Sequence, residues 1–226
     1  MRRYGWKIIV LLIIAAIVFL WLIKAPIMSA YISNKMKVPV AVGNISMWPS
    51  QTTIRDFKIS NPRGFKTKAA FEADHTTISY DFKRLTGEVS EIDKILIDGV
   101  YLSIDCSNSS CSSNNWTAIG AQMPKEDKRI HEVLVHDLIL TNMTVEIRGL
   151  GLYGGKPETK YFDRMEFREI DSRTGFPTKE LITKIFGNAG IMDYIKGVFD
   201  LPQNAIQKFL NPLKGFGSEN EGAKRP

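Results

Sequence analysis

With 226 residues, 44% of them apolar and 24% charged, the chain is long enough for one domain of ordinary size and is not disordered in bulk. Its formal net charge of +6 would suit a nucleic acid or an anionic membrane. The Lys and Arg residues are dispersed, however, and no nucleic-acid-binding motif accompanies them. We therefore expect a basic, solvated surface and no nucleic-acid partner.

An uninterrupted apolar run, residues 8–23, lies between Lys7 and Lys24. A helix of this length spans about 24 Å, and snorkelling lysines with nearby aromatic side chains extend it toward the ~30 Å of a bilayer core. Basic residues precede the run, so the N-terminus is expected in the cytoplasm. A cleaved signal peptide is the alternative, but no small-x-small cleavage site follows. The sequence thus predicts an uncleaved transmembrane anchor.

A short amphipathic stretch at residues 27–36 and a strand at 41–47 are expected next. Residues 54–61 then follow a strand-like pattern that ends in a turn residue, and this pattern recurs at 92–99 and 135–142. Residues 162–167 form a decayed fourth copy. Such recurrence suggests a β-rich module built from similar strand units, although any β-meander shows alternation followed by a turn.

The alternation of apolar residues changes parity at Asp98-Gly99, between Ile97 and Val100. The same change occurs at Thr141-Asn142. A two-residue hairpin explains such a change, and a bulge within one long strand explains it equally well.

Several segments together resemble the N-terminal region of AsmA-like proteins. They are the anchor, residues 37–49 (KVPVAVGNISMWP), residues 54–65 (IRDFKISNPRGF), residues 95–104 (ILIDGVYLSI) and the Asn-Trp pair at 115–116. The resemblance covers most of residues 1–150 through apolar spacing and turns. It implies one inner-membrane helix and a periplasmic, curved β-sheet with an apolar concave face. Larger relatives form lipid-conducting grooves, whereas this chain has room for only a few strand units.

We accordingly predict an α+β, β-rich protein with a single N-terminal transmembrane helix, a curved antiparallel β-sheet and C-terminal amphipathic helices. Its expected localisation is the inner membrane, with a cytoplasmic N-terminus and a periplasmic bulk. The C-terminal helices either cover the sheet or lie on anionic lipid. The expected segments are a cytoplasmic tail (1–7), the anchor (8–27), the sheet domain (28–172), the helices (173–214) and a disordered tail (215–226).

No residue spacing assembles an acid, a base and a nucleophile, so we predict a protein that is not an enzyme. The three histidines and two cysteines provide no recognisable metal-ligand set, and no cofactor motif is present. Cys106 and Cys111 are expected to form a disulfide in an oxidising compartment. In a reducing one they would be idle thiols or part of an unseen metal site.

The predicted function is the binding or passing of lipid, such as phospholipid, along an apolar β-groove during envelope biogenesis. The alternative is a structural or assembly factor that binds a protein partner in the envelope, for example by strand addition at a sheet edge. The candidate lipid-contacting residues are Phe57, Ile59, Ile95, Ile97, Val100, Leu102, Ile104, Leu138, Leu140 and Val145.

Overall fold

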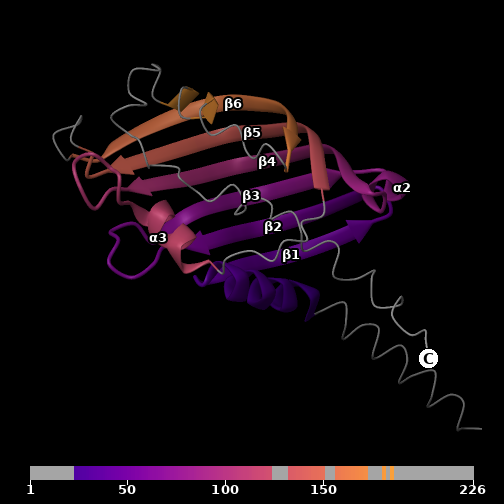
Figure 1. Ribbon diagram of the computed structural model, residues 1–226, viewed down its shortest axis with the longest axis horizontal. Coiled ribbons are helices and arrows are strands. Elements are labelled where there is room, and N and C mark those ends of the chain that lie inside the picture. The colour runs from indigo at the N-terminus through magenta and orange to yellow at the C-terminus, as the bar shows by residue number, and fades with distance from the viewer. Residues whose placement is uncertain (1–22, 124–131, 151–155, 173–179, 182–183, 186–226) are drawn as a thin grey trace, which may run out of the picture.

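The computed structural model describes residues 23–123, 132–150 and 156–172, together with Glu180, Leu181, Lys184 and Ile185. Six strands form one sheet in the order β1-β2-β3-β4-β5-β6 (Figure 1). The strands are β1 (Val40–Trp48), β2 (Gln51–Ser60), β3 (Ala69–Ser79), β4 (Val89–Asp105), β5 (Glu132–Arg148) and β6 (Glu158–Asp171). The helices are one over residues 23–36, α2 (Phe82–Leu85) between β3 and β4, and α3 (Asn115–Gln122) between β4 and β5.

The sheet is not wholly antiparallel, which corrects the predicted arrangement. Strands β4 and β5 are parallel, with Ile95 opposite Leu138, whereas the other four neighbouring pairs are antiparallel. Parallel neighbours need a long crossover because the chain must return to the end where the first strand began. The connection from residue 106 to residue 131, which carries α3, provides that return.

The predicted transmembrane helix and inner-membrane localisation are also corrected. Among the described residues, no helix is long and apolar enough to span a membrane. Of the predicted anchor at 8–27, residues 23–27 begin the helix over 23–36, in which Ala25 is buried, and residues 8–22 lie outside the described part. The fold described here is therefore a six-stranded β-sheet with short helices.

The helix over residues 23–36 includes the stretch predicted at 27–36 and covers the outer edge of β1. Ser29 Oγ accepts a hydrogen bond from the Val42 amide at 2.9 Å, and Ser33 Oγ accepts one from the Val40 amide at 2.8 Å. Ile32 and Met36 are buried in the same apolar core as β1. Hydrogen-bonded cover of this kind protects an edge strand from pairing with another chain.

Most of the predicted C-terminal helical region and all of the predicted tail lie outside the described residues. Four residues of the region are described as helical, and two of them, Leu181 and Ile185, are buried in the core beside the sheet. Lys184 donates a hydrogen bond to the Glu166 carbonyl of β6 at 2.8 Å. For these four residues, the alternative in which the helix covers the sheet is the one observed.

Every strand carries an interruption at the same level of the sheet. The pairing of β1 with β2 passes from Val42↔Phe57 directly to Asn44↔Arg55, and the other antiparallel pairs skip one corresponding position; the parallel pair β4–β5 skips Val100 and Met143 there as well. We call the residues at this level the interruption row: Gly43, Asp56, Asp74, Gly99, Asn142 and Asp163. The register is unchanged across it, because both strands of each pair skip the same number of residues. Strands β4, β5 and β6 carry a second interruption, at Asp93, His136 and Glu169.

The interruption row moves the apolar residues from one parity to the other. Ile97 and Val100 both contribute to the core although they are three residues apart, as do Leu140 and Met143. Gly99 and Asn142 have positive φ angles of 65° and 50°, and Asp56 has one of 53°. A residue in this conformation acts as a bulge that turns the following side chains to the opposite face. The bulge alternative is thus confirmed, and both segments are single long strands.

The residue types of the interruption row suit its backbone. Asn, Asp and Gly tolerate the left-handed region better than other residues. The Asn142 side chain is also held across the sheet, since its Nδ2 donates to Asp98 Oδ1 at 2.7 Å. Thr141 Oγ1 donates to the same oxygen, and these two hydrogen bonds hold the pKa of Asp98 below its ordinary value.

Replacing Gly99 by Ala is expected to cost roughly 2–4 kcal/mol of unfolding free energy, measured by urea denaturation. The φ of 65° is strained for Ala, and an added Cβ would lie 2.8 Å from the Asp74 Cβ. Gly64→Ala is the control, because Gly64 also has a positive φ but no atom lies within 4 Å of an added Cβ. Equal losses in the two variants would show that the contact with Asp74 is unimportant.

Candidate functional site

The candidate site is one side of the sheet, which we call the apolar face. Eight of the predicted lipid-contact residues are at most 7% exposed, and the other two, Ile97 and Leu138, are partly buried against the same core. The structure therefore brings all ten predicted residues to one face. They share it with Val40, Val42, Ile45, Ile92, Val135, Met143, Ile147, Met165, Phe167 and Ile170.

The apolar face is organised as rows that cross the strands. One row runs from Val40 through Ile59, Phe71 and Leu102 to Val145. Side chains opposite one another on neighbouring strands are close enough to pack, so this row is a continuous apolar contact. Two further rows cross all six strands and are apolar except at one threonine each: Ile45-Ile54-Thr76-Ile97-Leu140-Met165 and Met47-Thr52-Ile78-Ile95-Leu138-Phe167.

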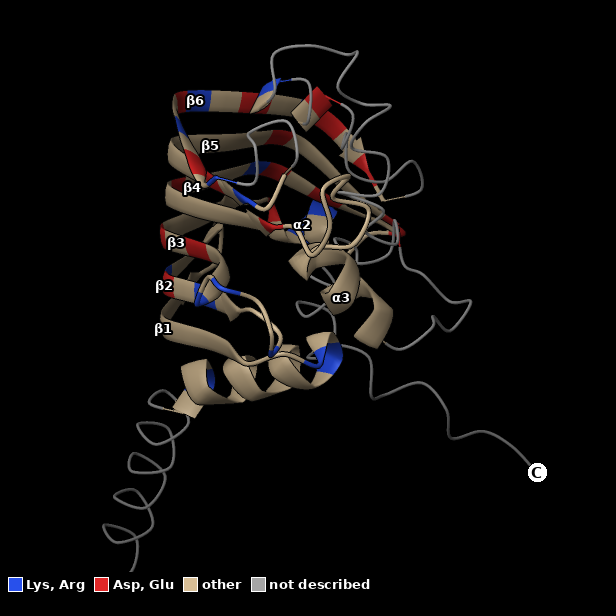
Figure 2. Cartoon of the chain, turned by 90° about the vertical axis from the view of Figure 1, so that its left-hand side faces the viewer, with Lys and Arg blue, Asp and Glu red and all other residues tan. Residues whose placement is uncertain are grey.

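The opposite side of the sheet is polar and carries ion pairs (Figure 2). Lys58 on β2 lies 2.5 Å from Glu72 on β3, and Arg84 lies 2.6 Å from Asp93. Tyr101 donates a hydrogen bond to Glu146, and its partial burial and that bond together raise the pKa of Tyr101. Exposed ion pairs contribute little stability, so their main effect is to keep this side in water. The sheet thus has one apolar and one charged side.

A histidine bridges three strands on the charged side. His136 on β5 lies 3.0 Å from a carboxylate oxygen of Glu169 on β6 and 3.5 Å from one of Glu91 on β4. The hydrogen bond to Glu169 is the largest influence on the pKa of His136 and raises it, with Glu91 acting in the same direction. The charged imidazolium therefore stabilises this corner of the sheet.

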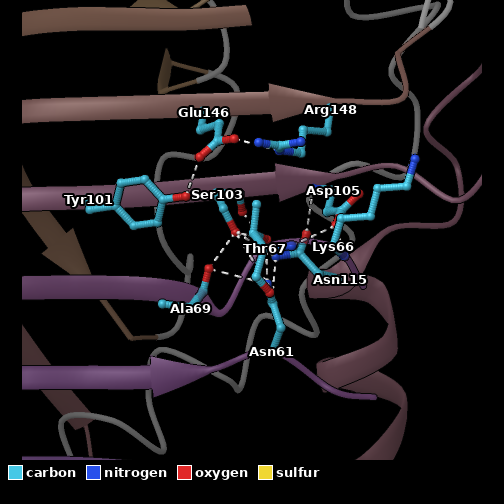
Figure 3. Close-up of polar contacts among 10 residues, drawn as sticks. All are labelled: Asn61, Lys66, Thr67, Ala69, Tyr101, Ser103, Asp105, Asn115, Glu146 and Arg148. Atoms are coloured by element: carbon cyan, nitrogen blue, oxygen red, sulfur yellow. Dashed lines mark hydrogen bonds and ion pairs between the residues drawn. The ribbon is translucent and has the colours of Figure 1, made fainter. Parts of the chain in front are cut away.

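A buried polar network fastens α3 to the apolar face at the end of β4 (Figure 3). Asn115, which is fully buried, donates from Nδ2 to Asn61 Oδ1 at 2.8 Å and to the Ser103 carbonyl at 3.0 Å. Its Oδ1 accepts from the Asp105 amide at 3.0 Å. Trp116 donates from Nε1 to the same Ser103 carbonyl at 2.7 Å. The side chain of Asn115 therefore connects α3, β4 and the turn after β2.

The turn after β2 is held by the same network. Asn61 Nδ2 donates to the Thr67 carbonyl at 2.9 Å and to the Ala69 carbonyl at 3.2 Å. Asp105 Oδ2 accepts from the amides of Lys66 and Thr67. Buried polar groups cost stability unless they are hydrogen-bonded, and here each has a partner. We call this set, Asn61, Thr67, Ser103, Asp105 and Asn115, the polar latch.

The loop before α3 is closed by the predicted disulfide. Cys106 and Cys111 are bonded, with 4.7 Å between their Cα atoms. Asn114 begins α3, and its side chain accepts from the amides of Trp116 and Thr117 at 2.9 and 3.0 Å. The disulfide and this N-cap fix the start of the helix, which places Trp116 and Ile119 in the core.

Most of the polar latch was not predicted from the sequence. Asn61 was expected as a turn residue and the Asn115-Trp116 pair as a point of resemblance, and neither Thr67, Ser103 nor Asp105 was a candidate. Ser103 stands between Leu102 and Ile104 and follows the alternation of an exposed position, yet it is fully buried. No local signal distinguishes such a residue, because its burial depends on contacts with Thr67 and Ala69, 36 and 34 residues earlier in the chain.

Comparison with protein-family models, with characterised proteins and with solved structures finds no match for this chain. The similarity to AsmA-like proteins therefore remains a prediction from the sequence. The described residues contain no group of three or more His, Cys, Asp or Glu side chains that could hold a metal ion.

Replacing Asn115 by Ala is expected to lower the unfolding free energy by about 2–4 kcal/mol, because it removes the hydrogen bonds of several buried groups. The exposed Asn108, which bonds to Ser112 within the disulfide loop, provides the matched control Asn108→Ala. Urea denaturation measures both. A loss for Asn115→Ala as small as that for Asn108→Ala would contradict the role of the latch.

The His136→Asn variant is expected to lose more stability at about pH 5 than at about pH 8. A raised pKa in the folded state means that the stabilisation is fully present below the unfolded-state pKa and disappears as the pH rises through the folded-state pKa. Denaturation curves of both proteins across this range measure the difference. The difference should be unchanged by pH if neither Glu91 nor Glu169 acts on the imidazole.

Proposed function

We propose that the protein binds the hydrocarbon part of a lipid against the apolar face. The observation that carries the proposal is the arrangement of apolar side chains in rows that cross the strands, while the other side of the same sheet is charged. A sheet that forms an ordinary closed core needs an apolar area only as large as the elements that pack against it. Rows that cross the sheet provide a long, uniform surface of the kind that an acyl chain can follow.

The dimensions of the sheet suit an acyl chain. Six strands at a spacing of about 4.8 Å make the sheet roughly 24 Å wide. One acyl chain occupies about half of the ~30 Å hydrocarbon core of a bilayer, or ~15 Å. A row across the sheet is therefore long enough to accommodate a chain of ordinary length. The resemblance to AsmA-like proteins, in which an apolar sheet face is expected to carry lipid, agrees with this proposal.

The two partly buried candidates, Ile97 and Leu138, are the residues at which a bound lipid is most accessible to a probe. Ile97 follows Leu96 on β4, and the two side chains belong to opposite faces of the sheet. Both are partly exposed, and they occupy the same stretch of β4. They therefore form a matched pair.

A photocrosslinking amino acid at Ile97 is expected to form adducts with phospholipid when the full chain is expressed and irradiated in cells. The same amino acid at Leu96 should give few, because that side chain lies on the charged side. Mass spectrometry of the purified protein identifies the adducts. Equal lipid adducts at the two positions, or none at Ile97, would contradict lipid binding by the apolar face.

A second candidate function is the binding of a protein partner, and the burial of the face favours it. Val100, Ile104 and Val145 are at most 1% exposed, as in an ordinary closed core. The edge of β1 is covered by Ser29 and Ser33, so strand addition would take place at β6, the other edge of the sheet. A protein that co-purifies with the chain in a stoichiometric amount, together with no lipid adduct at Ile97, would support protein binding over lipid binding.

A further inference from the structure

Large apolar side chains are exposed at one end of the sheet. Trp48 is 65% exposed, Phe82 63% and Met47 45%. We call these three residues the apolar end. Single exposed apolar residues are common on protein surfaces, but a cluster of large ones marks an interaction site.

The residues of the apolar end come from two segments that the sheet brings together. Trp48 is the last residue of β1 and pairs with Gln51, which pairs in turn with Ser79 at the end of β3. Phe82 follows three residues later as the first residue of α2. In Figure 1, α2 and the end of β1 lie at the same, right-hand end of the sheet. The helix over residues 23–36 runs antiparallel to β1, so its first turn points toward this end.

Hydrogen bonds hold the turns at the apolar end in place. Tyr80 donates from its hydroxyl to the Trp48 carbonyl and from its amide to the Ser50 carbonyl, each at 3.0 Å. Asp81 accepts from the Lys83 amide at 2.8 Å and so begins α2. The exposed aromatic side chains are therefore presented by ordered backbone.

We propose that the apolar end seats on the surface of a lipid bilayer. Trp and Phe side chains at the tips of ordered turns bury their rings at the boundary of headgroups and acyl chains. Lys83, which is exposed beside Phe82, is placed to meet lipid phosphates. This contact does not depend on lipid binding by the apolar face.

The chain before the described residues supports a lipid surface over other occupants. Twenty-two residues precede the helix over 23–36, and residues 8–23 contain no charged or strongly polar side chain. This segment joins the described part at the first turn of that helix, toward the apolar end. The described part therefore continues into apolar sequence from the turn that points toward the exposed apolar side chains, as a lipid surface requires. A protein partner would not require this coincidence.

Brominated lipids test the proposal through Trp48. In the full chain with Trp6→Phe and Trp21→Phe, only Trp48 and the buried Trp116 remain, and the further variant Trp48→Phe isolates the Trp116 signal. We expect vesicles of phosphatidylcholine and phosphatidylglycerol with brominated acyl chains to remove about half or more of the Trp48 emission, because a ring at the interface lies within ~5–10 Å of the bromines. Unquenched Trp48 in vesicle-bound protein would overturn the proposal.

Tyr161 provides the matched control position. It is 76% exposed on β6 and lies in the cross-strand row that begins at Ala41, seven residues or ~23 Å along β1 from Trp48. A Tyr161→Trp substitution in the chain with Trp6, Trp21 and Trp48 replaced by Phe should show little quenching. Equal quenching at both positions would overturn the proposal. A blue shift of Trp48 without quenching, together with a dimeric mass, would overturn it in favour of a second copy of the chain.

Discussion

The fold depends on the interruption row, the level at which every strand breaks its alternation together. If only one strand of the sheet changed the parity of its side chains, that strand would place half of its apolar residues in water or lose register with its neighbours. Because Gly43, Asp56 and Gly99 share this level with positions on the other strands, the register is preserved on both sides of it. One apolar and one charged face therefore extend along strands as long as 17 residues.

The polar latch orders the connections at one end of that sheet. The parallel pairing of β4 and β5 requires a long crossover, and long connections cost conformational entropy. Here the cost is offset locally by the disulfide, the N-cap at Asn114 and the buried side chain of Asn115. The turn that follows β2 is ordered by the same residues, so two connections far apart in sequence stabilise each other.

The two ends of the sheet consequently differ in chemistry. At the end of the sheet where β4 ends, polar groups are buried and hydrogen-bonded, and Trp116 of α3 packs into the core. At the opposite end, apolar side chains such as Trp48 and Phe82 face outward from short turns. Both proposals rest on this distribution, in which the sheet has an apolar face and an apolar end.

Much of the local structure could be predicted from the sequence. The strand near residues 41–47, the helix near 27–36, the disulfide and the parity changes at Gly99 and Asn142 depend on residues close together in the chain, and the structure agrees with them. The ten candidate residues also share one face as expected, since alternation is a local property. The first copy of the recurring pattern behaves differently: Asn61 ends it in the turn after β2, whereas Gly99 and Asn142 lie within long strands.

Other features were decided only by the tertiary structure. The predicted single-pass architecture rested on an apolar run, its flanking residues and the resemblance to AsmA-like proteins, and no described helix is long and apolar enough to cross a membrane. The parallel pairing of β4 with β5 and the bond between Asn61 and Asn115 join residues about 40 to 55 positions apart, and the interruptions align between different strands. Nothing in a local pattern specifies such partners. They are selected because they satisfy buried hydrogen bonds and keep apolar side chains together, and both requirements are properties of the assembled sheet.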